Sequence, residues 1–139
     1  MTPFKIKDKE YRIHLTYRQC LQEIPKKFDI HICKMFTDSE KSSDTLERLM
    51  MDDELTINLL WHLIQDEAVI TYDEFLDSLS GAELDKFREA FWDEVANFFG
   101  PLRQGMIRQI WKEFKKEIKK ADLQKMTSEK SYTESSQEE

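Results

Sequence analysis

The feature that most constrains the fold is a pair of apolar stripes that meet at Gly100-Pro101. On each side of this joint, large apolar side chains recur every three or four residues. This spacing predicts two amphipathic helices, 83–99 and 101–121. Glycine suits the C-terminal cap of one helix, and proline suits the first turn of the next, so the joint marks the boundary between them.

The apolar surface of these two helices is wider than one packing seam needs, which favours a surface built for a protein partner. The candidate partner-binding residues are Trp92, Phe98, Phe99, Met106, Ile110, Trp111 and Phe114. A methionine beside large aromatic side chains suits an adaptable contact. The competing interpretation, that most of these residues close the core of the domain itself, stays open for each of them.

The first 36 residues predict a β-hairpin followed by short helices. Apolar and polar residues alternate in 4–6 and again in 11–15, which is typical of two paired strands. The side chains expected to face the core are Phe4, Ile6, Tyr11, Ile13 and Leu15. Thr16 and Gln19 have the spacing of a capping box and predict a helix start. Pro25 predicts that this helix ends or kinks, and a further short helix is expected at 28–36.

The middle of the chain predicts one buried helix between polar connections. We expect an exposed loop at 37–44 and a helical turn or two at 45–51. The acidic residues Asp52 to Glu54 favour a helix start, and 55–64 is apolar around most of its circumference. A second capping-box spacing begins a short helix, 72–79.

Length and composition bound the class of protein. A chain of 139 residues with 40% hydrophobic and 35% charged residues and three glycines fits one helix-rich domain. We therefore predict a mainly α fold: a small helical domain, 1–100, with an N-terminal β-hairpin, then a long basic amphipathic helix, 101–126. The segment 127–139 is rich in Ser, Thr, Glu and Gln and is expected to be disordered. No apolar run suggests a membrane span and no secretory signal is visible, so we expect a cytosolic protein.

Charge is distributed unevenly along the chain. The net charge of −7 divides into +4 for residues 1–37, −13 for 38–100, +5 for 101–126 and −3 for 127–139. This asymmetry favours self-association or a partner with a complementary patch. A solvated surface that resists aggregation explains the acidic middle equally well.

The sequence offers no pattern for catalysis, a cofactor or a metal. Cys20 and Cys33 are expected to be small buried residues rather than a disulfide. His62, inside the apolar helix, is expected to be a core histidine. The letters that end at Glu74 resemble the end of a calcium loop, but the carboxylate and glycine that begin and bend such a loop are missing. We predict a protein that is not an enzyme.

The helix after the joint carries a basic patch: Lys112, Lys115, Lys116, Lys119 and Lys120. Such a patch attracts phosphates, which makes nucleic acid an alternative partner. Glu113 and Glu117 interrupt it and can pair with lysines three residues on. The molecule is also acidic overall, so docking to a protein is favoured over nucleic acid.

The order of motifs resembles a known family. An N-terminal hairpin runs through Tyr11-Arg-Ile-His-Leu-Thr-Tyr-Arg into a helix, and Asp53-Glu-Leu-Thr-Ile-Asn-Leu-Leu-Trp-His-Leu follows. Then come Ile70-Thr-Tyr-Asp-Glu-Phe-Leu-Asp and an acidic helix that ends in Phe98-Phe-Gly. Over residues 4–100 this order is similar to the small tail assembly chaperones of long-tailed bacteriophages and prophages of Gram-positive bacteria. The chain departs from that pattern at Pro25, where such proteins continue the first helix, and its basic final helix is longer.

The resemblance implies a non-enzymatic task in virion assembly. Proteins of this family bind the helical tape-measure protein in the host cytoplasm, keep it soluble and help to recruit tail-tube subunits. They are absent from the mature virion. Two alternatives are a nucleic-acid-binding phage regulatory protein that uses the basic helix, and a structural head–tail or tube-end component.

Overall fold

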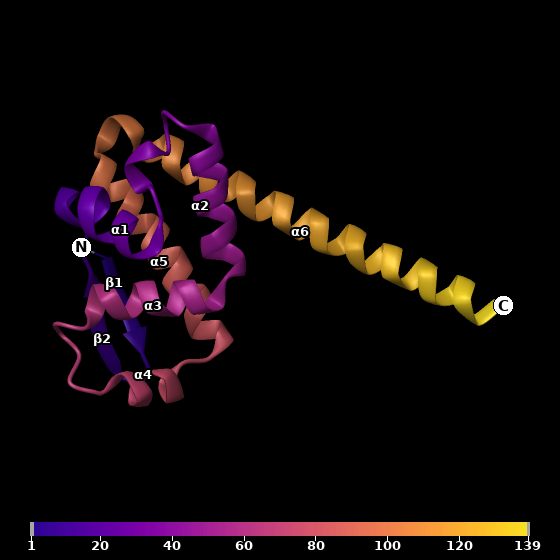
Figure 1. The fold of residues 1–139 in the computed structure, drawn as a ribbon, viewed down its shortest axis with the longest axis horizontal. Coiled ribbons are helices and arrows are strands. Elements are labelled where there is room, and N and C mark those ends of the chain that lie inside the picture. Colours follow the sequence, from indigo (N-terminus) through magenta and orange to yellow (C-terminus); the bar gives the residue numbers. More distant parts are fainter. Residues whose placement is uncertain (1, 139) are drawn as a thin grey trace.

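The computed structural model describes the backbone of residues 2–138 and the side chains of residues 2–120. The fold is mainly helical, with a two-stranded antiparallel hairpin at the N-terminus and a long helix at the C-terminus (Figure 1). The predicted fold class is therefore confirmed. Among the described residues, the structure has no helix with both the length and the apolar composition needed to cross a membrane.

The hairpin forms as the alternation predicts. Strand β1 (Thr2–Ile6) pairs antiparallel with β2 (Lys9–Ile13), and Phe4 lies opposite Tyr11. The predicted inward side chains are all buried: Phe4, Ile6, Tyr11, Ile13 and Leu15. A lone hairpin is marginal in water, and this one packs on a helix: the ring centroids of Phe4 and Phe87 are 5.8 Å apart.

The first helix passes through Pro25 instead of ending there. The Thr16 amide donates to Gln19 Oε1 at 3.0 Å and the Gln19 amide donates to Thr16 Oγ1 at 3.2 Å, which confirms the capping box. A π-helical segment, η1 (Gln19–Glu23), then leads directly into α1 (Ile24–Phe28). The π-helical segment directly precedes the turn that contains Pro25, and the chain stays helical through the proline to Phe28. Asp29, with φ at 54°, terminates it.

The expected loop at 37–44 is wrong. Helix α2 (Ser39–Met51) begins there because Asp38 Oδ1 accepts a hydrogen bond from the Lys41 amide at 3.1 Å. The helix is amphipathic and buries Thr45, Leu46 and Leu49. The helix expected at 28–36 is reduced to a 3₁₀ turn, η2 (Ile32–Lys34).

The apolar middle of the chain forms the predicted buried helix. Helix α3 (Asp53–Ile64) starts with Asp52 Oδ1 accepting from the Leu55 amide at 3.0 Å, and it buries Leu59, Leu60 and Ile64. Helix α4 (Tyr72–Ser78) begins with a complete capping box between Thr71 and Glu74. Both predicted starts are confirmed.

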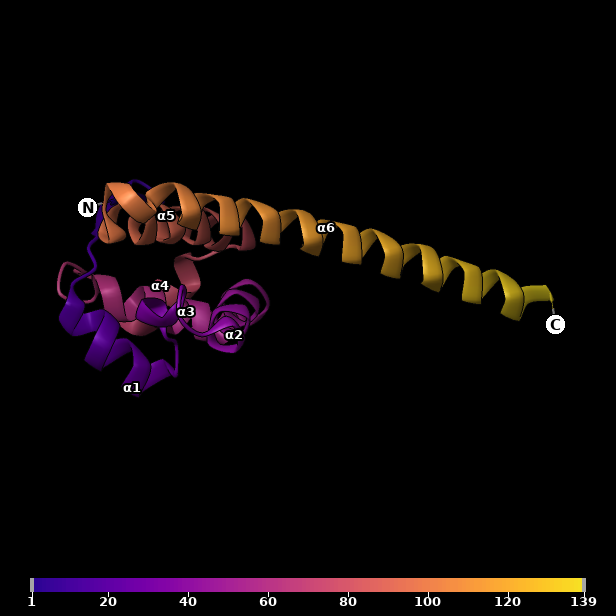
Figure 2. The ribbon, with the colours of Figure 1, turned by 90° about the horizontal axis from the view of Figure 1, so that it is seen from above.

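The last two helices form a hairpin around Gly100. Helix α5 (Gly81–Phe99) ends at this glycine, whose φ of 79° suits a residue without a Cβ. Helix α6 (Pro101–Glu138) turns back along α5 and then runs outward, away from the rest of the chain (Figures 1 and 2).

The far end of α6 differs from the sequence analysis. The helix was expected over 101–121, and the basic segment that contains it over 101–126, whereas the backbone is helical through Glu138. The expected disorder of 127–139 stays a prediction. The sequence has neither proline nor glycine after Gly105 that would stop the helix. The side chains from residue 121 onward, and residue 139 as a whole, lie outside the described residues.

Candidate partner-binding surface

Three of the seven predicted partner-binding residues are closed inside the domain. Trp92, Phe99 and Trp111 are only 2%, 9% and 6% exposed. The rings of Trp92 on α5 and Trp111 on α6 stack with centroids 5.3 Å apart. For these three residues the competing interpretation holds: they close the core and hold α6 against α5.

Polar contacts extend this α5–α6 seam. Arg108 Nη1 donates to Asp93 Oδ1 at 2.7 Å, and Lys115 Nζ donates to Glu89 Oε1 at 2.8 Å. The indole N–H of Trp111 donates to the other Glu89 oxygen at 3.2 Å. The basic helix therefore docks, over its first turns, on the acidic helix that precedes it.

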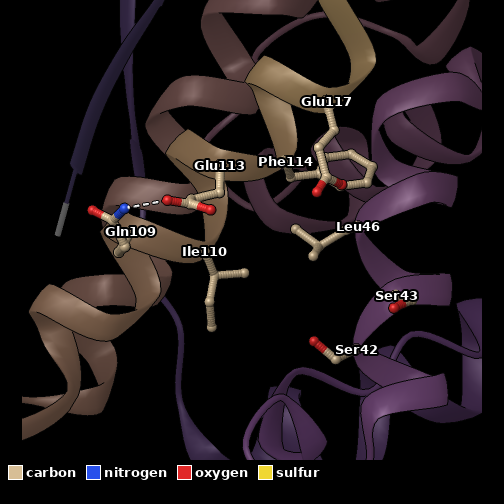
Figure 3. A pocket seen from close by; sticks show the side chains of 8 residues that line it. All are labelled: Ser42, Ser43, Leu46, Gln109, Ile110, Glu113, Phe114 and Glu117. Atoms are coloured by element: carbon tan, nitrogen blue, oxygen red, sulfur yellow. Dashed lines mark hydrogen bonds between the residues drawn. The ribbon is translucent and has the colours of Figure 1, made fainter. Parts of the chain in front are cut away.

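Ile110 and Phe114 line a groove on the other flank of α6. The groove lies between α2 and α6, has a volume of about 380 Å³ and is drawn in Figure 3. We call it the α2–α6 groove; its lining residues are Ser42, Ser43, Leu46, Gln109, Ile110, Glu113, Phe114 and Glu117. Ile110 and Phe114 are each half-buried, so part of each side chain stays open to solvent.

The groove combines an apolar floor with an acidic edge. Ile110 points into the space between the helices, and Ser42 lies across from it on α2 (Figure 3). Glu113 accepts a hydrogen bond from Gln109 Nε2 at 2.7 Å, so its carboxylate is held at the groove. Helical spacing puts Glu117 one turn further along the same edge.

The two other predicted residues lie near the joint of the helix hairpin. Phe98 is half-buried against the ring of Tyr17, with centroids 4.7 Å apart. Met106 is 54% exposed, and Leu102, one turn before it, is 95% exposed. We call the side chains Tyr17, Phe98, Leu102 and Met106 the hairpin corner.

The basic patch is not one continuous free surface. Lys112, Lys116, Lys119 and Lys120 are exposed, whereas Lys115 is partly buried by its pair with Glu89. Among the lysines whose side chains the structure describes, none lines the α2–α6 groove. Over residues 101–120, helix α6 therefore presents the carboxylates of Glu113 and Glu117 to the groove and most of its ammonium groups to solvent on other sides.

The α2 wall of the groove is the part that the sequence analysis missed. Ser42 and Ser43 fell in the expected loop, and Leu46 was not connected with the final helix. The available signal was Asp38, a good N-cap residue. It was weak because Ser and Asp residues, which favour turns, follow it.

The two cysteines are structural side chains of the domain. Cys20 is buried, as predicted, whereas Cys33 is half-buried, and both cysteines are free thiols. Burial, followed by the neighbouring Cys33, raises the pKa of the Cys20 thiol to about 12, which disfavours the reactive thiolate. Within the part of the chain that the structure describes, no three His, Cys, Asp or Glu residues are placed to hold a metal ion.

Comparisons with protein-family models, with curated proteins and with solved structures find no match for this chain.

Proposed function

We propose that this protein is a non-enzymatic assembly chaperone that binds helices of a partner protein. Following the resemblance, we propose that the partner is the tape-measure protein of a bacteriophage tail. The chaperone would keep it soluble in the host cytoplasm, help to recruit tail-tube subunits and stay out of the mature virion. The observation that carries the proposal is the α2–α6 groove, an open apolar site beside a helix that runs out from the body.

Such a partner exposes an apolar stripe along its helix. A long amphipathic helix that has not yet been enclosed presents apolar side chains at i, i+3, i+4 and i+7. A groove between two helices receives such a stripe by packing, as a third helix would. The half-buried side chains of Ile110 and Phe114 supply an apolar surface that complements this stripe. Exposed Leu102 and Met106 at the hairpin corner add a second apolar contact.

Co-expression with the tape-measure gene from the same phage or prophage tests the proposal. We expect the soluble fraction of the tape-measure protein to rise with this chain, compared with an unrelated acidic helical protein made at the same level. An unchanged soluble fraction would contradict the proposal. Mass spectrometry of purified particles separates a chaperone from the structural alternative, because only a head–tail or tube-end component would remain in them.

The exposed lysines of α6 favour one second candidate, a nucleic-acid-binding regulator. Lys112, Lys116 and Lys119 would contact phosphates, and affinity for DNA or RNA would fall steeply as salt rises. Replacing these three lysines by glutamine would then abolish binding. Under the chaperone proposal, the same variant keeps its effect on the tape-measure protein.

A further inference from the structure

We infer that the α2–α6 groove selects a basic amphipathic helix, one whose apolar stripe is flanked by lysine or arginine. This inference rests on the proposed function for the partner's role and adds the partner's chemistry.

The first step is the shape of the groove. Its walls are two helices, and its lining residues on α6 follow helical spacing from Gln109 to Glu117. Its apolar side chains are Leu46 on one wall and Ile110 and Phe114 on the other. Leu46 is 6% exposed, so it forms the floor. An extended strand would leave its backbone groups unpaired here, because neither helix offers free backbone donors or acceptors along its middle turns.

The second step is the charge at the edge. Glu113 and Glu117 both line the groove, and among residues 2–120 no lysine or arginine lines it. On the α2 side, the lining polar residues are the uncharged Ser42 and Ser43. A helix that buries its apolar stripe here brings its flanking side chains next to these carboxylates. Lysine or arginine at those flanks gains charge pairs, whereas glutamate or aspartate meets like charge.

The third step excludes the chain's own basic segment as the occupant. The lysines of α6 belong to the same helix that forms one wall, and the first turns of that helix are fixed to α5 by Arg108 and Lys115. In a second copy, the apolar stripe beside these lysines is already engaged, because Trp111 is 6% exposed and stacks on Trp92 of α5. A partner helix that carries both an apolar stripe and flanking basic residues fits the groove, because the stripe packs on the apolar floor and the basic residues pair with the acidic edge.

The test uses the intact chain and two synthetic helical peptides. Both peptides carry leucines at i, i+3/i+4 and i+7; one has lysine at all flanking positions and the other has glutamate there. Fluorescence anisotropy at physiological salt measures each affinity. We expect the basic peptide to bind at least about tenfold more tightly than the acidic one.

Variants separate the groove from the general acidity of the chain. Glu113→Gln with Glu117→Gln removes the acidic edge and should weaken binding of the basic peptide roughly three- to tenfold. Asp8→Asn with Glu10→Gln removes the same amount of charge from two exposed residues at the turn of the β1–β2 hairpin. This control should leave the affinity unchanged. Equal losses in both double variants would overturn the inference, because they would show attraction to net charge alone.

A steric variant tests the location independently. Ser43 is exposed on the α2 wall, so Ser43→Trp fills the groove and should weaken peptide binding at least about tenfold. Lys112→Trp places the same ring on an exposed residue of α6 outside the groove and is the matched control. Circular dichroism checks that both tryptophan variants are folded. If Ser43→Trp unfolds, the comparison between the two double variants tests the inference instead.

The inference and the proposed function fail in different ways. If the wild-type chain keeps the tape-measure protein soluble and the groove variants do so equally well, the groove inference is wrong and the function stands. If the wild-type chain binds the basic peptide through the groove but has no effect on the tape-measure protein, the function is wrong and the groove stands.

Discussion

Arg88 joins three helices through one buried side chain. Its guanidinium, 8% exposed, donates to Asp53 Oδ1 at 2.7 Å and to Asp85 Oδ1 at 3.0 Å. Its Nε donates to the Leu49 carbonyl at 2.7 Å. Because Leu49 lies on α2, Asp53 on α3 and Asp85 on α5, this residue fixes α2, one wall of the α2–α6 groove, to the rest of the domain.

Arg88→Met should lower the free energy of unfolding by about 1–3 kcal/mol, because three charge-assisted hydrogen bonds are lost from a mostly buried site. Arg108→Met is the matched control. Arg108 is 48% exposed in its pair with Asp93, so its loss should cost less than about 1 kcal/mol. Denaturant unfolding measures both, and equal destabilisation would contradict this assignment.

His62 makes stability depend on pH. Desolvation, followed by the nearby charge of Lys27, lowers the pKa of this imidazole from its ordinary value of 6.5, and the Glu23 carboxylate opposes the shift. Between the ordinary and the lowered pKa, the unfolded chain binds more protons than the folded one. The contribution of His62 is therefore present above pH 6.5 and is lost as pH falls through that window.

His62→Leu should flatten the fall in unfolding free energy between about pH 7 and pH 5, because the group that charges on unfolding is gone. His14→Gln, at an exposed position, should keep the wild-type slope. Chemical denaturation at several pH values measures the slopes. An unchanged slope in His62→Leu would show that other groups carry the dependence.

At the scale of elements, two glycines of the helix hairpin should respond in opposite ways to alanine. Gly100 has φ at 79°, which an L-residue rarely adopts, so Gly100→Ala should cost about 1–3 kcal/mol. Gly105 lies inside α6 with nothing within 4 Å of an added Cβ, so Gly105→Ala should stabilise by roughly 0.5–1 kcal/mol. Thermal unfolding compares the two, and stabilisation by Gly100→Ala would contradict the hairpin geometry.

The elements that were predicted correctly carry strong local signals. Each of these signals lies within a few residues of the chain. They are the alternation around Tyr11, the capping boxes at Thr16 and Thr71, and the Gly100-Pro101 joint. Local patterns of this kind need no tertiary information. The β-hairpin, the starts of the first helix, α3 and α4, and the turn between α5 and α6 were therefore accessible from the sequence.

The elements that were missed depend on tertiary contacts. Helix α2 contains Ser42, Ser43 and Asp44, which favour turns, and it is held by burying Leu46 and Leu49 on other helices. Pro25 was expected to end or kink the first helix, and the chain stays helical past it, with Ile24 and Phe28 buried. Because α2 forms one wall of the α2–α6 groove, missing this helix meant that the groove could not be predicted from the sequence.

Which apolar residues are core and which are surface was also beyond the sequence. Trp111 and Phe114 both continue the stripe of α6, yet Trp111 stacks on Trp92 and Phe114 opens toward the groove. The difference is set by where α5 and α2 lie around α6. Spacing along one helix does not contain that information.

At the scale of the whole molecule, the uneven charge of the sequence has a structural counterpart. The basic start of α6 docks on acidic α5 through Arg108 and Lys115. The carboxylates of Glu113 and Glu117 remain at the α2–α6 groove, and the rest of α6 runs outward (Figure 2). This arrangement keeps an apolar groove accessible beside a long helix, which is the central feature of the proposed chaperone.

Site-specific photo-crosslinking in cells tests that central feature most directly. A photoreactive phenylalanine analogue placed at Ser43, inside the groove, or at Lys112, on the exposed side of α6, would be activated while the tape-measure protein is co-expressed. We predict a crosslink to the tape-measure protein from position 43 and none from position 112. A crosslink from position 112 alone, or from neither position while the tape-measure protein stays soluble, would contradict the account.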